Sequence, residues 1–328
     1  MQSAKVKASW FPYAVVIAVV VVSLVFAAIG FYSWHKMQAT MGDSDRSISI
    51  LFIMLGNDLV SLAISVAFGL GYTQWLLERH RIAGLPGYAA VCIGVLKLLL
   101  GFAVAFLWQI LVHALMLAYG HSTGMVLITV MNTVLGHLIS MADVIVPIWL
   151  VFLVLRGRAI PASPHPVELR GRALLMFTMF AWSWLLILAQ VASPMMGPVA
   201  VQLVDDSGVL ASPLSPYVGS LALLLPAFLG ALIGLPRSMP TTRPFRVWLS
   251  ASLAVLLCMV AMVVMTFAAV RIAALISEDF EPGIGFCAFI ALLWFLVSIP
   301  LCGLLARSLT REQAPPIRYD RGNESLAG

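Results

Sequence analysis

Stretches of about twenty apolar residues recur along the whole chain, and no other sequence feature restricts the possible folds as strongly. The sequence is 62% hydrophobic and only 10% charged, whereas soluble domains average about 25% charged residues. A helix of about twenty residues spans the hydrocarbon core of a bilayer. Within lipid, a helix also provides every backbone N–H and C=O group with a partner. The sequence therefore predicts an all-α integral membrane protein, built as a bundle of helices.

The apolar runs divide a single membrane domain, residues 1–306, into about eight predicted transmembrane helices. These helices are expected at 11–31, 48–77, 86–119, 124–155, 173–192, 217–235, 247–276 and 283–306. The third run exceeds the roughly twenty residues needed for crossing, so it is expected to tilt or to extend beyond the bilayer. Residues 307–328 form a polar tail, and no stretch outside the runs is long enough for an independent soluble domain.

Lysine and arginine are alternately abundant and sparse from one connection to the next. Fifteen of the nineteen lie on one side of the predicted bundle, the side that also holds both terminal segments. Basic residues favour the cytoplasmic side of a membrane, so both termini are predicted to be cytoplasmic. Labelling is then expected to reach Ser163 and Asp320 from inside, and Ser44 and Asp206 from outside. The short connections favour a bacterial inner membrane.

The sequence contains no pattern that predicts a cofactor, a metal site or a nucleic-acid surface. The four cysteines lie inside apolar runs without CxxC or Cys/His spacing, which indicates small core residues. The net charge of +5 comes from basic residues at helix ends, so it reflects topology and does not indicate nucleic-acid binding. The expected partners are the lipid bilayer and, in one hypothesis, another protein in the membrane.

The predicted helix 124–155 carries a line of polar and small residues through an otherwise apolar segment. Steps of three or four residues place on one face Asn132, Gly136, Ser140, Asp143 and Pro147, with His137 beside them. A carboxylate in the middle of a membrane is costly unless it faces protein or water. We therefore expect Asp143 to point inward and the other helices to pack around this one.

Depth along each helix predicts which polar side chains can meet. At about 1.5 Å of rise per residue, Lys97 and Asp143 lie ~14 and ~18 Å from the cytoplasmic ends of their helices, so an ion pair is expected. Asp58 and His137 lie at ~28 and ~27 Å, and they are expected to form a second, outer layer. Gln109 lies on a stripe that begins at Lys97 and repeats every four residues. The candidate residues of this polar core, between the second, third and fourth predicted helices, are Asp58, Lys97, Gln109, His137, Ser140 and Asp143.

Three interpretations of the polar core remain open. Intramembrane ionisable residues commonly lie on ion or substrate pathways, which favours a carrier, a channel or an ion-coupled membrane subunit. Alternatively, the charges only specify packing, and the protein is a non-catalytic partner: an assembly factor, a sensor or an immunity protein against a membrane toxin. A membrane-embedded enzyme is the least favoured interpretation. Its candidate residues would lie on the outer surface, namely His113, His121, Ser122, Asp205 and Asp206.

One segment matches a catalytic sequence pattern, but its predicted secondary structure does not fit that pattern. Residues 120–124 read Gly-His-Ser-Thr-Gly, which fits the serine-hydrolase pattern G-x-S-x-G. That mechanism requires a sharp strand-to-helix turn, whereas helices are predicted on both sides of this segment. Small residues in a turn between two helices explain the match equally well.

Two further segments carry predictions about packing. The connection 193–216 contains four prolines, which oppose a continuous span, and an apolar patch at 199–204. We expect this connection to pack on the outer face of the bundle. In the sixth predicted helix, Pro226, Gly230 and Gly234 form a face of small residues that favours close contact with another helix.

Overall fold

Helical backbone forms most of the described chain, as the apolar runs predict. The computed structural model describes residues 10–41, 44–161, 169–204, 215–237, 239, 242–276 and 284–310. At some helical positions, chiefly 37–41, 44–54, 120–130, 132–134 and 189–204, it describes the backbone without the side chains. The helices are α1 Phe11–Met41, α2 Ser44–His80, α3 Tyr88–Leu155, α4 Arg170–Val204, α5 Ser215–Gly234, α6 Pro244–Ile276 and α7 Ile284–Thr310.

The lengths and composition of these helices support an all-α, multi-pass membrane protein. Among the described residues, seven helical segments are long and apolar enough to cross a membrane. Helix α5 is the remaining candidate for a span, and its described apolar stretch, Leu223–Gly234, is shorter. The multi-pass architecture thus agrees with the sequence, and the count of eight crossings stays a prediction.

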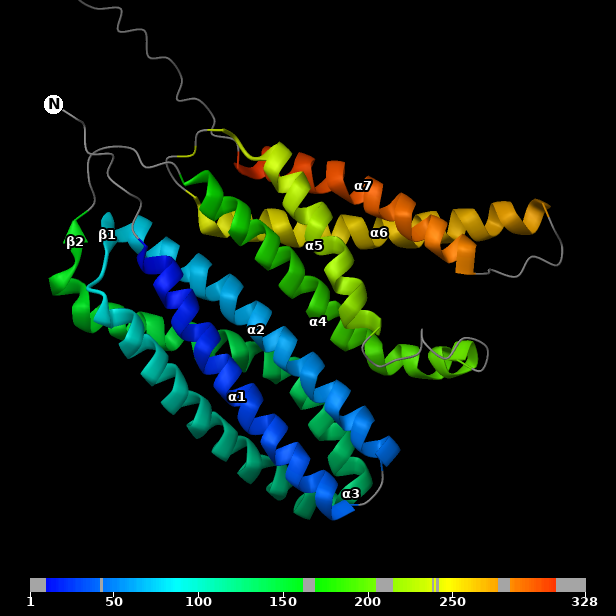
Figure 1. Ribbon diagram of the computed structural model, residues 1–328, viewed down its shortest axis with the longest axis horizontal. Coiled ribbons are helices and arrows are strands. Elements are labelled where there is room, and N and C mark those ends of the chain that lie inside the picture. The colour runs from blue at the N-terminus through cyan, green and yellow to red at the C-terminus, as the bar shows by residue number, and fades with distance from the viewer. Residues whose placement is uncertain are drawn as a thin grey trace, which may run out of the picture.

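Helix α3 is one element of 68 residues, but it contains two arms that are each long and apolar enough to cross a membrane. A straight helix of that length would extend about 100 Å. Instead its two ends meet, since Arg158 donates a hydrogen bond from Nη1 to the hydroxyl of Tyr88 at 3.1 Å. Figure 1 shows α3 reversing direction at the opposite end of the molecule. The first arm contains the candidate span Tyr88–Tyr119 and the second arm contains Leu135–Arg158, in agreement with two predicted helices.

Several helix ends rich in basic residues lie together, and we call this part of the molecule the basic end (Figure 1). Strand β1 (Ile82–Gly84), after α2, pairs antiparallel with strand β2 (Ile160–Pro161). The 3-10 turn η1 (Arg156–Arg158) connects α3 to β2. A backbone hydrogen bond of 3.0 Å from Leu169 N to Met239 O joins the start of α4 to the chain after α5. The described arginines of the basic end are Arg79, Arg81, Arg156, Arg158, Arg170, Arg172, Arg237, Arg243, Arg246 and Arg307.

The helices form two groups that share a seam between α2 and α4. In the first group, α1 and α3 pack with α2, and in the second, α4, α5, α6 and α7 pack with one another. Figure 1 shows α6 and α7 diverging from the first group with distance from the basic end. The largest apolar core lies around α4, and α2 contributes Ala67 and Leu70 to it.

The central position belongs to α2 and α4, which corrects the expectation that the other helices pack around the second arm of α3. In α2 and α4, 61% and 56% of the apolar segment is buried, against 28% in the second arm of α3. Close packing across the seam explains the difference. A Cβ atom at Gly71 would lie 2.8 Å from Phe180 Cζ, and Phe180 meets Phe68 edge to face at 5.5 Å.

The helices also extend further than the apolar runs indicate. Helical backbone continues in α4 through residues 193–204, the first half of the connection predicted at 193–216. Figure 1 shows this last part of α4 lying at an angle to the rest of the helix. Because proline more often bends a helix than forbids it when neighbouring segments support the backbone, Pro194 and Pro198 are compatible with this bend. Residues 205–214 lie outside the described chain.

Candidate functional site

Lys97 and Asp143 form an ion pair between the two arms of α3. The ammonium Nζ of Lys97 donates to Oδ2 of Asp143, so the pair predicted from matched depth is present. The side chain of Lys97 is 3% exposed and that of Asp143 is 15% exposed. In a medium of low polarity each charge would be costly alone, and the pair compensates both. The reversal of α3 brings these residues together from positions 46 residues apart.

The two oxygens of the Asp143 carboxylate have different surroundings. Oδ2 accepts the hydrogen bond from Lys97, whereas Oδ1 is buried and accepts no hydrogen bond from any residue that the structure describes. The adjacent Val144 is fully buried in an apolar cluster with side chains of α1, α2 and the first arm of α3. An ionised carboxylate has acceptor capacity at both oxygens, so Oδ1 is a position where a proton or a cation could bind.

The other predicted members of the polar core lie on α2 and on the two arms of α3. Ser140 donates its hydroxyl to the backbone carbonyl of Gly136 at 2.9 Å, a bond within its own helix. Gln109 is exposed on the first arm of α3, and His137 is buried on the second arm. Asp58 is partly buried on α2. The structure thus brings Lys97 and Asp143 together, and the grouping of the remaining residues into one core stays a prediction.

The relative depth of Asp58 and His137 follows from a contact between α2 and the second arm of α3. A Cβ atom at Gly69 would lie 3.7 Å from Val144 Cγ1, and both helices run toward the basic end. Asp58 precedes Gly69 by eleven residues and His137 precedes Val144 by seven, so their depths differ by ~6 Å, about one helical turn. An offset of this size is comparable with the change in depth that helix tilt can produce, so the outer layer stays a prediction.

A second polar network lies at the basic end and was missed by the sequence reasoning. The carboxylate of Glu78, at the end of α2, accepts bonds to Oε1 from Thr242 N at 2.7 Å and from Thr242 Oγ1 at 2.6 Å. Its Oε2 accepts a bond from Arg243 N at 3.3 Å. These donors immediately precede α6, so Glu78 supplies a carboxylate at a helix N-terminus, where negative charge is stabilising. Gln74, one turn earlier, donates to Glu78 Oε1 at 3.0 Å.

Arg172 extends this network into α4. Its Nη1 donates to Gln74 Oε1 at 2.8 Å, and its guanidinium lies 5.5 Å from the ring centroid of Tyr13 on α1. Arg172 is only 5% exposed. Sequence reasoning counted this arginine solely as a topology signal. The i, i+4 spacing of Gln74 and Glu78 in an apolar helix was the available sign that they act together, but their partner in α4 depends on tertiary structure.

The described residues give no support to a metal site. No group of three or more His, Cys, Asp or Glu side chains among them could hold a metal ion. Cys258 and Cys302 are both buried, with sulfur atoms 4.0 Å apart, and they pack between α6 and α7. Of the residues proposed for an enzyme, His113 is exposed, whereas the side chains of His121, Ser122, Asp205 and Asp206 lie outside the described set.

Comparisons of the chain with protein-family models, with curated proteins and with solved structures give no match. Inference about function therefore rests on the arrangement of side chains in this protein. Two arrangements among the described residues place charged groups where they could bind a proton or a ligand. They are the Lys97–Asp143 pair and the network around Glu78.

Proposed function

We propose that the protein is an ion-coupled membrane carrier, or a membrane subunit of one, and that protons act on the Lys97–Asp143 pair. One observation carries this proposal: the pair is buried between two arms of α3, and Asp143 Oδ1 accepts no hydrogen bond from a described residue. Ionisable residues inside the membrane commonly mark ion or proton pathways.

Protonation of Asp143 would change the stability of the paired arrangement. The neutral acid no longer compensates the ammonium of Lys97, and an unpaired buried ammonium is costly. The two arms of α3 would then separate and admit water to the ammonium of Lys97. This response couples proton binding to a change in the protein, because the proton binds the two arrangements with different affinity. Asp143 is the more exposed member of the pair, at 15% against 3%, so we assign it the role of proton acceptor.

Orientation forms part of the same proposal. We infer eight crossings with both termini in the cytoplasm, in a bacterial inner membrane. The alternation of basic residues along the sequence supports this orientation, and the gathering of basic helix ends at one end of the molecule supports it as well. In this orientation Asp58 and His137 lie toward the outer side, where they would connect the pair to external water.

Proton flux into proteoliposomes under an imposed membrane potential tests this function. Wild-type protein is expected to acidify the vesicle interior, and Asp143→Asn is expected to abolish this flux because the acceptor is lost. Asp58→Asn and His137→Gln are expected to alter its dependence on pH between about pH 5 and 8, the window in which histidine changes charge. His113→Gln changes an exposed histidine and should behave as wild type.

Absence of proton flux would have two explanations, a missing substrate or a missing proton site, and a chemical measurement distinguishes them. Dicyclohexylcarbodiimide modifies protonated carboxyl groups in apolar surroundings, and mass spectrometry locates the adduct. We expect labelling of Asp143, because its buried Oδ1 accepts no hydrogen bond from a described residue. If Asp143 stays unlabelled and every variant carries the same flux as wild type, the pair is structural. A non-catalytic membrane partner, such as an assembly factor, sensor or immunity protein, would then be the better proposal.

A further inference from the structure

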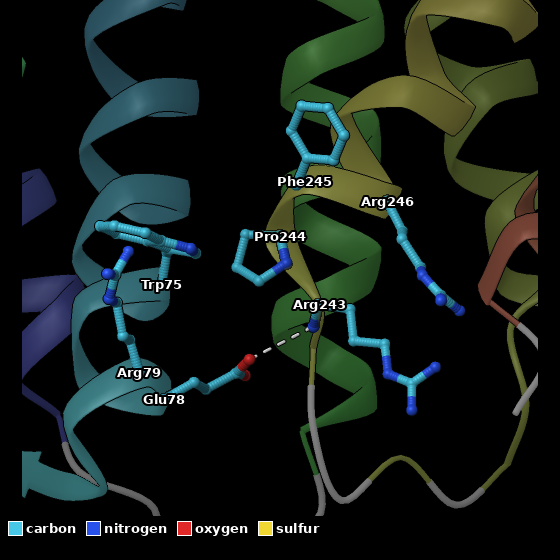
Figure 2. Close-up of a pocket in the computed structure, with 7 residues that line it drawn as sticks. All are labelled: Trp75, Glu78, Arg79, Arg243, Pro244, Phe245 and Arg246. Atoms are coloured by element: carbon cyan, nitrogen blue, oxygen red, sulfur yellow. Dashed lines mark hydrogen bonds between the residues drawn. The ribbon is translucent and has the colours of Figure 1, made fainter.

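A pocket opens at the basic end between the last turns of α2 and the start of α6. Its volume is about 420 Å³. Figure 2 shows Trp75 and Arg79 on α2, with Pro244 and Phe245 on α6 across from them. The lining residues are Trp75, Glu78, Arg79, Arg243, Pro244, Phe245 and Arg246. The pocket thus combines aromatic side chains, three arginines and a single carboxylate.

The pocket carries positive charge, because its three arginines outnumber its one carboxylate and that carboxylate already accepts hydrogen bonds. Glu78 accepts hydrogen bonds from Thr242 and from the backbone of Arg243. Neither Arg79 nor Arg246 forms an ion pair with a carboxylate among the residues that the structure describes. The guanidinium of Arg79 lies 4.9 Å from the ring centroid of Trp75, a cation–π contact that holds one cation at the pocket wall. The formal charge of the lining is +2, which favours an anion.

The pocket lies where two membrane spans end. The apolar span of α2 ends at His80, and that of α6 begins at Pro244. Below the pocket, α6 presents a stripe of exposed apolar side chains at helical spacing. They are Phe245, Leu249, Leu253 and Leu256, with exposures of 65%, 37%, 37% and 58%. Leu256 follows Phe245 by eleven positions, so the stripe is ~16 Å long along the helix. A cationic rim above an apolar stripe matches a molecule with an anionic head and an apolar tail.

We propose that this pocket binds the phosphate of an anionic lipid headgroup, with an acyl chain along the stripe on α6. Arginine binds phosphate through several N–H groups at once, and basic pockets between transmembrane helices on the cytoplasmic side favour anionic lipids. Arg79 and Arg246 are both exposed, and Figure 2 shows Arg79 beside Trp75 and Arg246 directed away from α2. In the proposed complex both long side chains turn toward a phosphate next to Phe245. This site does not depend on proton coupling at Lys97 and Asp143.

Lipid binding to the purified protein in detergent tests the proposal, with native mass spectrometry to measure the dissociation constant. Phosphatidylglycerol and phosphatidylcholine with identical acyl chains form one comparison, and inorganic phosphate forms the other. The wild-type protein is expected to bind phosphatidylglycerol about tenfold more tightly than phosphatidylcholine, given the contribution of each basic residue near an anionic lipid. Inorganic phosphate lacks acyl chains and is expected to compete poorly.

The matched variants remove equal charge from the same end of the molecule. Arg79→Gln with Arg246→Gln should remove the preference for phosphatidylglycerol, and Arg246→Gln alone should reduce it to about threefold. Arg156→Gln with Arg307→Gln, at exposed positions outside the pocket, should leave it unchanged. All four arginines are exposed, and unchanged size-exclusion profiles would confirm folding. Equal loss in both double variants would overturn the proposal in favour of diffuse attraction. If inorganic phosphate bound as tightly as phosphatidylglycerol, the proposal would be overturned in favour of a soluble anionic ligand.

Discussion

Charged side chains in this protein are compensated in two different places. Lys97 and Asp143 compensate each other deep within the first helical group, where water is scarce. Glu78 and Arg172 lie at the basic end, where Glu78 accepts bonds from the residues that precede α6 and Arg172 donates to Gln74 of α2. Depth along the helices sufficed to predict the first arrangement, because both residues belong to consecutive apolar runs. The second could not be predicted in this way, since Thr242 lies 164 residues from Glu78 and only the fold joins them.

The ion pair makes a prediction about stability. Lys97→Ala should lower the free energy of unfolding by about 3–5 kcal/mol, because it leaves the Asp143 carboxylate buried without its partner. Lys97→Met combined with Asp143→Leu removes both charges while retaining apolar volume, and it should recover most of this loss. Denaturant unfolding in detergent micelles measures both values. If the double variant is no more stable than the single variant, the pair does not stabilise the fold.

Among the helices, the sequence pattern predicted the contacts made by small residues more accurately than it predicted the lengths of the helices. The small face of α5 makes the close helix contact that was predicted, and its partner is α7: a Cβ atom at Gly230 would lie 2.6 Å from Ile299 O, and one at Gly234 would overlap Gly303 O. Helix ends were less predictable, because polar residues can continue a helix beyond the membrane. Thus α1 extends to Met41, whereas its apolar run ends near residue 31.

The contact between α5 and α7 can be tested with paired glycine variants. Gly234→Ala places a methyl group against the backbone of Gly303, and we expect the resulting overpacking to lower the free energy of unfolding by about 1–3 kcal/mol. Gly285→Ala, in the first turn of α7, adds a methyl group with no described atom within 4 Å. It should change stability by less than about 0.5 kcal/mol. Equal effects of the two substitutions would contradict this close approach of the helices.

At the scale of the molecule, two helical groups are joined along α2 and α4. The sequence predicted the multi-pass helical class and the polar helix that carries Asp143, but it placed the wrong helix at the centre. Apolar runs are similar along most of the chain, so their composition does not reveal which helix is enclosed. In α2 and α4, buried contacts such as that of Gly71 with Phe180 decide this position, and they form only between distant segments.

We propose that the whole basic end faces the cytoplasmic side of the membrane. The depth of the Lys97–Asp143 pair, the side from which protons reach it and the leaflet that supplies the lipid all depend on this orientation. Cysteine accessibility in intact cells measures it directly. The starting protein has alanine in place of Cys92, Cys258, Cys287 and Cys302, and single cysteines are then introduced at Ser44, Ser163, Asp206 and Asp320.

A membrane-impermeant maleimide should label the cysteines at positions 44 and 206 in intact cells. Those at positions 163 and 320 should react only after the membrane is opened, because the positive-inside rule assigns the basic connections to the cytoplasm. Unchanged expression of each single-cysteine protein serves as the control for folding. Labelling of 163 or 320 from outside, or protection of 44 or 206 in intact cells, would contradict the orientation.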